Sequence, residues 1–213
     1  MVVRAVKKSS DGADCTKVAS RARPGDPSED VFAALLERAR SGDGPAWETI
    51  YRWLAPAVAG YLRVQGARDV DDLTSEVFLA LVRSIGRFAG GAAQFRSFTF
   101  VIAHRRLQDE RRSRARQLRR TVDEPVDADP SLDSAGLDPA DAALAALGRG
   151  KVVAMCGRLA ADQRDVVLLR IVGDLSVEQV AEALGRSSGA VKQLQRRAFE
   201  HLRKEISAEA VTR

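Results

Sequence analysis

The stretch from Phe95 to Arg120 constrains the fold more than any other part of the chain. It contains neither Gly nor Pro, so one helix can run through most of it. Its first half is apolar and aromatic, and its second half is rich in arginine: Arg105, Arg106, Arg111, Arg112, Arg114, Arg116, Arg119 and Arg120. We expect one end of this helix to be buried in a hydrophobic core and the other end to bind the phosphate groups of a polyanion. The guanidinium group matches the geometry of phosphate oxygens, and the release of counterions drives such binding. The alternative is a solvated charged helix, but only Asp109 and Glu110 oppose these arginines.

The composition predicts an all-α fold. Ala, Leu, Arg and Glu abound, and aromatic residues make up only 5% of the 213 residues. Runs of β-branched and aromatic residues with period-two alternation are scarce, which argues against strands. The net charge of +5 is compatible with a nucleic-acid partner.

Nothing in the sequence predicts a cofactor, a metal site or membrane contact. Cys15 and Cys156 are isolated from each other, and His104 and His201 have no ligand companions nearby. No apolar run approaches the roughly 20 residues that span a bilayer, and the N-terminus lacks the apolar segment of a signal peptide. We therefore expect a cytoplasmic protein with two reduced thiols.

Charge and proline content divide the chain into two small helical domains joined by an acidic flexible linker. Residues 1–28 show no periodicity and are expected to form a disordered extension. The segment from Asp123 to Asp141 holds seven acids, three prolines and no Lys or Arg, which predicts an extended linker over 121–140. The domains then cover 29–120 and 141–207. One hypothesis is that the linker folds back and screens the arginines when no nucleic acid is bound.

Two helices are expected at the start of the first domain. Ser28 precedes an apolar run and is a suitable N-cap. The segment SGDGP at 41–45 ends that helix, and Pro45 is suited to open the next one. The second helix covers 46–64, and we expect Pro56 to kink or divide it.

A third, strongly amphipathic helix is expected over 69–88. Its apolar stripe is regular, and Asp69, Asp71 and Asp72 lie in its first turn. One explanation for these acids is the helix dipole, which favours negative charge at this end. The other is an acidic docking face for a basic partner.

The second domain is expected to contain a helix over 141–159, and then a helix capped by Asp162. Gly173 and Asp174 form the following turn. Ser176 with Gln179 three residues later is a capping box for a short helix.

The end of the second domain predicts a helix-turn-helix. Gly185 suits the left-handed turn position, and the last helix covers 188–206. In this motif the second helix lies in the major groove of DNA, and Gln, Lys and Arg can read base edges. A plain helical hairpin is the alternative. The residues predicted to contact DNA are Arg186, Ser187, Ser188, Lys192, Gln193, Arg196 and Arg197.

Three segments in this order resemble bacterial RNA polymerase sigma factors of the extracytoplasmic-function group. They are DVDDLTSEVFLALVRSIGRF, QFRSFTFVIAHRRLQDERRSRAR and LAADQRDVVLLRIVGDLSVEQVAEALGRSSGAVKQLQRRAFEHLRK. The resemblance covers about 31–206. It departs from the usual pattern at Ser75, where Gln is common, and at Phe98, where Trp is common.

The resemblance implies a partner for each surface. The acidic helix matches the segment that docks on core RNA polymerase, through Asp71, Asp72, Leu73 and Glu76. The arginine helix matches the segment that opens and reads the −10 promoter element, through Phe95, Arg96, Phe98, His104, Arg105, Arg106, Arg111 and Arg112. The helix-turn-helix matches the reader of the −35 element. An anti-sigma factor is the usual regulator in this family, and the linker matches the segment that threads the RNA exit path.

We therefore predict a transcription initiation factor that binds core RNA polymerase and promoter DNA and has no active site. One alternative is a helix-turn-helix regulator that binds duplex DNA without being a polymerase subunit. A nucleic-acid enzyme is disfavoured, because we find no P-loop, no metal cluster, no nucleophile motif and no paired carboxylates in a suitable context.

Overall fold

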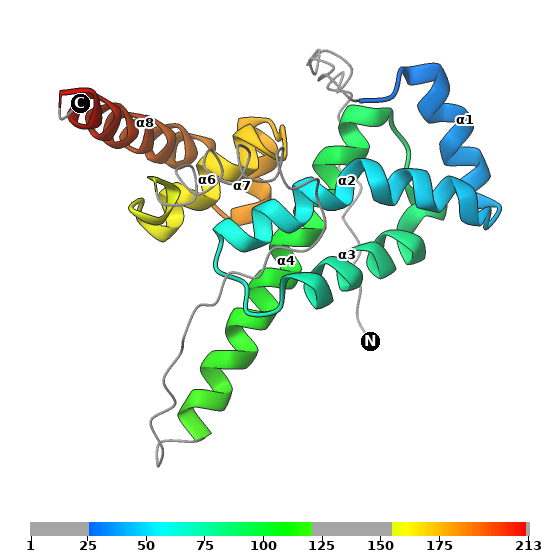
Figure 1. The fold of residues 1–213 in the computed structure, drawn as a ribbon, viewed down its shortest axis with the longest axis horizontal. Coiled ribbons are helices and arrows are strands. Elements are labelled where there is room, and N and C mark those ends of the chain that lie inside the picture. The colour runs from blue at the N-terminus through cyan, green and yellow to red at the C-terminus, as the bar shows by residue number, and fades with distance from the viewer. Residues whose placement is uncertain (1–25, 121–154, 212–213) are drawn as a thin grey trace.

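The computed structural model describes residues 26–120 and 155–211, and every regular element within them is a helix (Figure 1). The first domain contains α1 (Glu29–Arg40), α2 (Gly44–Val64), α3 (Val70–Ser84), the 3-10 helix η1 (Ile85–Arg87) and α4 (Ala92–Arg120). The second domain contains α6 (Ala161–Ile171), α7 (Val177–Leu184) and α8 (Ser188–Val211). The all-α prediction with two helical domains is confirmed. The expected linker and most of the 141–159 helix lie outside the described residues.

The predicted starts of α1 and α2 are confirmed. The Ser28 side chain accepts a hydrogen bond from the Val31 amide at 3.4 Å, and Pro45 lies in the first turn of α2. Pro56 does not divide α2, which continues to Val64. Pro56 is exposed, so water can bind the carbonyl group that its missing N–H leaves free.

The predicted helix over 69–88 is an α-helix followed by one 3-10 turn. Asp69 lies at the N-cap, where its side chain accepts from the Asp72 amide at 2.9 Å. The turn at 85–87 keeps Ile85 buried on the same stripe as Leu81. The Arg40 guanidinium group donates to the carbonyl oxygens of Ile85 and Phe88, which ties α1 to the segment that leads into α4.

Aromatic rings fix the start of α4 in the core of the first domain. The Phe95 side chain is fully buried. Its ring centroid lies 5.4 Å from that of Phe32, 5.0 Å from that of Phe88 and 6.4 Å from that of Trp53. Such tilted, edge and stacked contacts add stability beyond the buried area. The apolar half of the arginine helix is thus buried, as the sequence predicts.

The second domain has the predicted helix-turn-helix. Ser176 and Gln179 form both bonds of the capping box, at 3.1 Å and 2.7 Å, and Gly185 adopts the left-handed conformation with φ 61°. The prediction for Asp162 was wrong, because Ala160 occupies the cap position of α6 and Asp162 lies in the first turn. There the helix dipole still favours its charge.

The two domains touch each other in the described part of the chain. Helix α7 contacts α4, and buried side chains of both domains belong to one hydrophobic cluster. The C-terminal half of α4 extends beyond the other helices (Figure 1). Among the described helices, none is both long enough and apolar enough to cross a membrane.

The capping box of α7 gives a stability prediction. Ser176→Ala removes the side-chain oxygen that accepts from the Gln179 amide. We expect the free energy of unfolding to fall by about 1 kcal/mol, as for other N-cap serines. Urea unfolding followed by circular dichroism measures this change. Ser207→Ala, a serine within α8 whose hydroxyl bonds the Arg203 carbonyl oxygen, is the control and should be near neutral; equal losses would contradict the capping role.

Candidate nucleic-acid interface

The residues predicted to read duplex DNA gather on the turn before α8 and on the first half of that helix. Arg186, Ser187, Lys192, Gln193, Arg196 and Arg197 are exposed, and Ser188 is half-buried. Val191 and Ala198 are fully buried and anchor the opposite side of α8. We call this exposed set the recognition surface.

Three members of the recognition surface also have structural contacts. The Ser187 hydroxyl accepts from the Ala190 amide at 3.2 Å and so caps the start of α8, a role that the sequence analysis missed. Arg186 pairs with Asp162 of α6, and Arg196 lies 3.8 Å from Glu200. All four of these charged side chains are well exposed, so such pairs contribute little stability and can exchange for phosphate.

Positive charge continues beside the recognition surface. Arg170, Lys192, Arg196 and Arg203 line one groove between α6, α7 and α8, together with the exposed ring of Phe199. A concentration of this kind attracts a phosphate backbone.

Three residues of α4 that were predicted to contact the −10 element are buried. Phe95 lies within the ring cluster of the core. Arg96 stacks over the Trp53 ring at 5.4 Å and pairs with Asp26, and only 7% of it is exposed. His104 is 3% exposed. In this conformation all three side chains point into the protein interior, because the first half of α4 packs against other helices of the first domain and against the second domain.

The other predicted residues of α4 remain accessible. Arg105 and Arg112 are exposed, whereas Phe98, Arg106 and Arg111 are half-buried. Arg112 lies 3.6 Å from Asp109, and Arg106 lies 3.9 Å from Glu76 of α3. The exposed surface of α4 therefore keeps the cationic character that the sequence predicts.

The acidic face of α3 is also accessible. Asp71 and Asp72 are exposed side chains in the first turn of the helix. Glu76 is half-buried, and Leu73 is 5% exposed because it packs into the core. Leu79 and Val82 are exposed further along the helix, so the acids are followed by an apolar patch.

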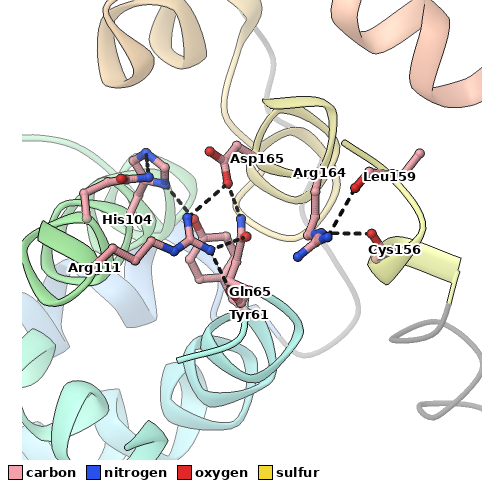
Figure 2. Close-up of polar contacts among 9 residues, drawn as sticks. Tyr61, Gln65, His104, Arg111, Cys156, Leu159, Arg164 and Asp165 are labelled. Carbon is pink, nitrogen blue, oxygen red and sulfur yellow. Dashed lines mark hydrogen bonds and ion pairs between the residues drawn. The ribbon is translucent and has the colours of Figure 1, made fainter. Parts of the chain in front are cut away.

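A buried polar network joins the two domains (Figure 2). Gln65 Nε2 donates to Asp165 Oδ1 at 2.6 Å, and Arg111 Nη1 lies 4.0 Å from the same oxygen. Arg111 Nη2 also donates to the Gln65 carbonyl oxygen at 2.6 Å. Tyr61 OH and His104 Nδ1 lie 2.8 Å apart. A single acid of α6 is thus held by Gln65, at the C-cap of α2, and by Arg111 of α4.

Burial controls the titration of this network. It lowers the pKa of His104 below its usual 6.5, with Arg111 and Arg105 adding to the effect and Asp165 opposing it. Burial also raises the pKa of Tyr61, and Asp165 adds to that rise. His104 is therefore neutral at pH 7 in this arrangement.

The sequence analysis missed Asp26, Tyr61, Gln65 and Asp165. Gln65 and Asp165 are 100 positions apart, so no local pattern connects them. One signal was available, because Asp165 directly precedes the apolar run VVLL on a predicted helix, where an acid needs a partner if it is buried. In the described residues, no group of His, Cys, Asp or Glu is arranged to hold a metal ion.

Comparisons with known proteins agree with this layout. A profile for Sigma-70 region 2 matches residues 46–117, and one for Sigma-70, region 4 matches residues 157–204. The ECF RNA polymerase sigma factor BldN of Streptomyces coelicolor is 34% identical over 170 residues, which cover 79% of this chain. The chain spans 63% of the length of BldN, less than two thirds. The ECF RNA polymerase sigma factor SigD of Mycobacterium tuberculosis is 30% identical over 181 residues, which cover 82% of this chain and 84% of SigD.

Two solved structures share the fold. The structure of CnrH in complex with the cytosolic domain of CnrY has a TM-score of 0.54 and 24% identity, and the match covers 83% of this chain and 97% of that one. The sigma factor RpoE of Bartonella quintana, in complex with the anti-sigma factor NepR, has a TM-score of 0.55 and 18% identity over 75% of this chain and 96% of that one. With both region profiles matched in order, the chain belongs to the extracytoplasmic-function group of the sigma-70 family, the non-catalytic RNA polymerase subunits that direct transcription initiation.

Proposed function

We propose that the chain docks on core RNA polymerase through α3, reads the −10 promoter element with α4 and reads the −35 element with α8. The observation that carries this proposal is the placement of one accessible acidic face and two accessible cationic faces on separate helices. A helix-turn-helix regulator that acts without the polymerase would use only the cationic face of α8. The proposed region 2 and region 4 domains, 29–120 and 141–207, contain the matched segments 46–117 and 157–204.

The proposed polymerase contact is the exposed part of α3. Asp71 and Asp72 offer two accessible carboxylates to a basic partner, and Leu79 and Val82 offer apolar area beside them. Leu73 supports this face from below, since it is packed into the core. Glu76 contributes while it also orients Arg106.

The proposed −10 contact uses side chains of α4 in two ways. Arg105, Arg106 and Arg112 are placed to bind backbone phosphates, and the half-buried ring of Phe98 is suited to stack on an unpaired base. Phe95 and Arg96 hold the start of the helix in place, and His104 and Arg111 become available when the two domains separate.

The regulator and the location are also proposals. The RpoE structure from Bartonella quintana contains the anti-sigma factor NepR. We infer that an anti-sigma factor also binds this chain and covers the same surfaces. The proposed place of action is the cytoplasm, where bacterial core polymerase and promoter DNA meet.

Removal of charge from α8 tests the −35 assignment. Lys192→Ala with Arg196→Ala should weaken binding to −35 duplexes by at least about tenfold, because a base contact contributes about 1–3 kcal/mol. The slope of log K against log salt should fall by about 1 for each phosphate group that the variant no longer binds. Fluorescence anisotropy at several salt concentrations measures both quantities.

The matched control removes positive charge from the same helix. Lys204→Ala lies further along α8, outside the groove that Arg203 lines, and its side chain is exposed. Binding of core polymerase by the Lys192 and Arg196 variant should stay unchanged. Loss of polymerase binding, or an equal loss of DNA binding in the control, would contradict the assignment.

Charge reversal on α3 tests the polymerase contact. Asp71→Lys with Asp72→Lys should abolish co-purification with core polymerase and run-off transcription, because two cations would face a basic partner. Binding to isolated −35 duplexes should persist. The control is Asp30→Lys, which reverses an exposed acid in the first turn of α1. A variant that still binds polymerase at wild-type affinity would exclude this face of α3.

A further inference from the structure

Helix α1 lies outside the segment that the region 2 profile matches, yet it contacts both η1 and the start of α4. Near the beginning of α1, the Glu29 carboxylate lies so close to Gly91 that a β-carbon on Gly91 would collide with it. The Phe32 ring lies 5.4 Å from the Phe95 ring of α4. Helix α1 therefore shapes the path by which the chain enters α4.

Arg40, in the last turn of α1, holds the turn before α4 by its backbone. Its Nε donates to the Ile85 carbonyl oxygen at 3.5 Å, and its Nη2 donates to the Phe88 carbonyl oxygen. Ile85 is the first residue of η1, and Phe88 is the residue that follows η1. One guanidinium group thus spans the whole turn, because its donors form a rigid fork.

The contacts of Arg40 differ from those of a free surface cation. Its remaining nitrogen, Nη1, pairs with Glu37, so all three nitrogen atoms of the group have partners within the protein. The side chain is 30% exposed, less than half the value for Arg112. This geometry favours a role in fixing the turn over a role in binding phosphate.

The residue that Arg40 holds carries a ring that supports the proposed base-stacking residue. The Phe88 and Phe98 rings are both half-buried, and their centroids lie 5.5 Å apart with the planes inclined by 31°. The Phe88 ring also meets the fully buried Phe95 ring edge-on, at 5.0 Å. Phe88 thus links the hydrophobic core to Phe98.

The backbone after Phe88 packs tightly against the same ring. Gly90 has φ 152°, a conformation that residues with a side chain rarely adopt, and a β-carbon there would lie 3.1 Å from the Phe88 ring. The Gln94 side chain accepts from the Gly91 amide at 3.1 Å. A shift of the Phe88 carbonyl group would therefore move the ring and the turn together.

We propose that Arg40 is a positioning residue for recognition of the −10 element. By holding the Phe88 carbonyl group it fixes the Phe88 ring, which in turn keeps the Phe98 ring in the orientation that stacks on an unpaired base. Arg40 itself touches no base. The inference rests on the proposed function, because it takes Phe98 as the residue of α4 on which the base stacks.

The size of the expected effect follows from the strength of stacking. An aromatic ring contributes roughly 5-fold to 150-fold in affinity for each base stacked on it. When the turn is released, the rings adopt several orientations, and the apparent affinity falls by the fraction of the chain that keeps the binding orientation. A fraction of about 10% weakens binding about tenfold.

Binding of single-stranded DNA by the complex of this chain with core polymerase tests the proposal. The probe is the non-template strand around the −10 element of a promoter that the wild-type complex transcribes, either intact or with one base replaced by an abasic site. The stacking position is the one at which loss of the base weakens wild-type binding at least about fivefold but leaves binding by Phe98→Ala unchanged.

Arg40→Ala should weaken binding of the intact probe about tenfold, and binding of the probe that is abasic at the stacking position by less than about twofold. A general structural defect would weaken both probes alike. The slope of log K against log salt should stay unchanged, whereas loss of a phosphate contact would lower it by about 0.7. Fluorescence anisotropy at several salt concentrations measures these quantities.

Arg38→Ala is the matched control. Arg38 lies in the same last turn of α1, carries the same charge and pairs with Asp43 at 2.6 Å. The control should bind both probes as the wild type does. An equal loss in Arg38→Ala, or a tenfold loss by Arg40→Ala on the abasic probe as well, would overturn the proposal.

A change at Phe88 tests the same path even if Arg40→Ala fails to fold. Phe88→Leu keeps an apolar side chain next to Phe95 but removes the flat ring that supports Phe98. It should weaken binding of the intact probe at least about fivefold and leave binding of the abasic probe within about twofold of the wild type. Normal binding of the intact probe by Phe88→Leu would contradict the proposal.

The two changes can also be combined. In the chain with Phe88→Leu, the further change Arg40→Ala should cost less than about twofold, because both residues act through one contact. Losses that multiply in full would show that Arg40 acts by another route and would overturn the proposal.

The outcomes keep the two proposals apart. If the wild-type complex does not bind the intact probe, or if no position depends on Phe98, the proposed −10 contact of α4 is refuted and the role of Arg40 is refuted with it. If the Phe98-dependent position is found and Arg40→Ala binds both probes normally, only the role of Arg40 is refuted.

Discussion

The structure depends on the way one helix, α4, is both buried and charged. Its first half is fixed by the rings around Phe95 and by Arg96, which stacks on Trp53 and pairs with Asp26. Its second half extends from the body of the protein with exposed arginines (Figure 1). Mutual repulsion of these arginines opposes a helix that stands alone, so the anchored half must hold the conformation. Burial at one end therefore makes a rigid cationic surface at the other.

The acidic and cationic surfaces of the first domain are adjacent. Helices α3 and α4 pack together, and Glu76 of one lies 3.9 Å from Arg106 of the other. Both side chains are partly exposed, so the pair itself contributes little stability. The ion pair instead fixes the position of Arg106, because a partner that attracts Glu76 frees Arg106 to bind a phosphate group. The proposed polymerase contact and the proposed DNA contact are thus joined through one exposed ion pair.

The arginines of α4 have different roles, which depend on how deeply each side chain is buried. Arg105 and Arg112 face water, whereas Arg111 is directed at Asp165 and Gln65 of the interdomain network. In sequence these residues are equivalent members of one charged run. The direction in which each side chain leaves the helix axis, together with the position of α6, decides the difference. Arg105 and Arg112 become surface cations, whereas Arg111 becomes one partner of a buried ion pair.

The sequence by itself determined what is local or periodic. Ser28, Ser176, Gln179 and Gly185 act at the predicted helix ends, since capping involves residues within one turn. The amphipathic stripe of α3 followed from a repeating pattern, and the division into two domains followed from the charge and proline content of the segment between them.

The tertiary structure alone decided which charged residues are buried and which residues pair with them. Asp165 takes its partners from 54 to 100 positions away along the chain, Arg96 takes Asp26 from 70 positions away, and neither pairing leaves a local signal. The physical reason is that a charge is stabilised in the interior only by groups brought to it by folding, whereas a helix is specified by neighbours along the chain.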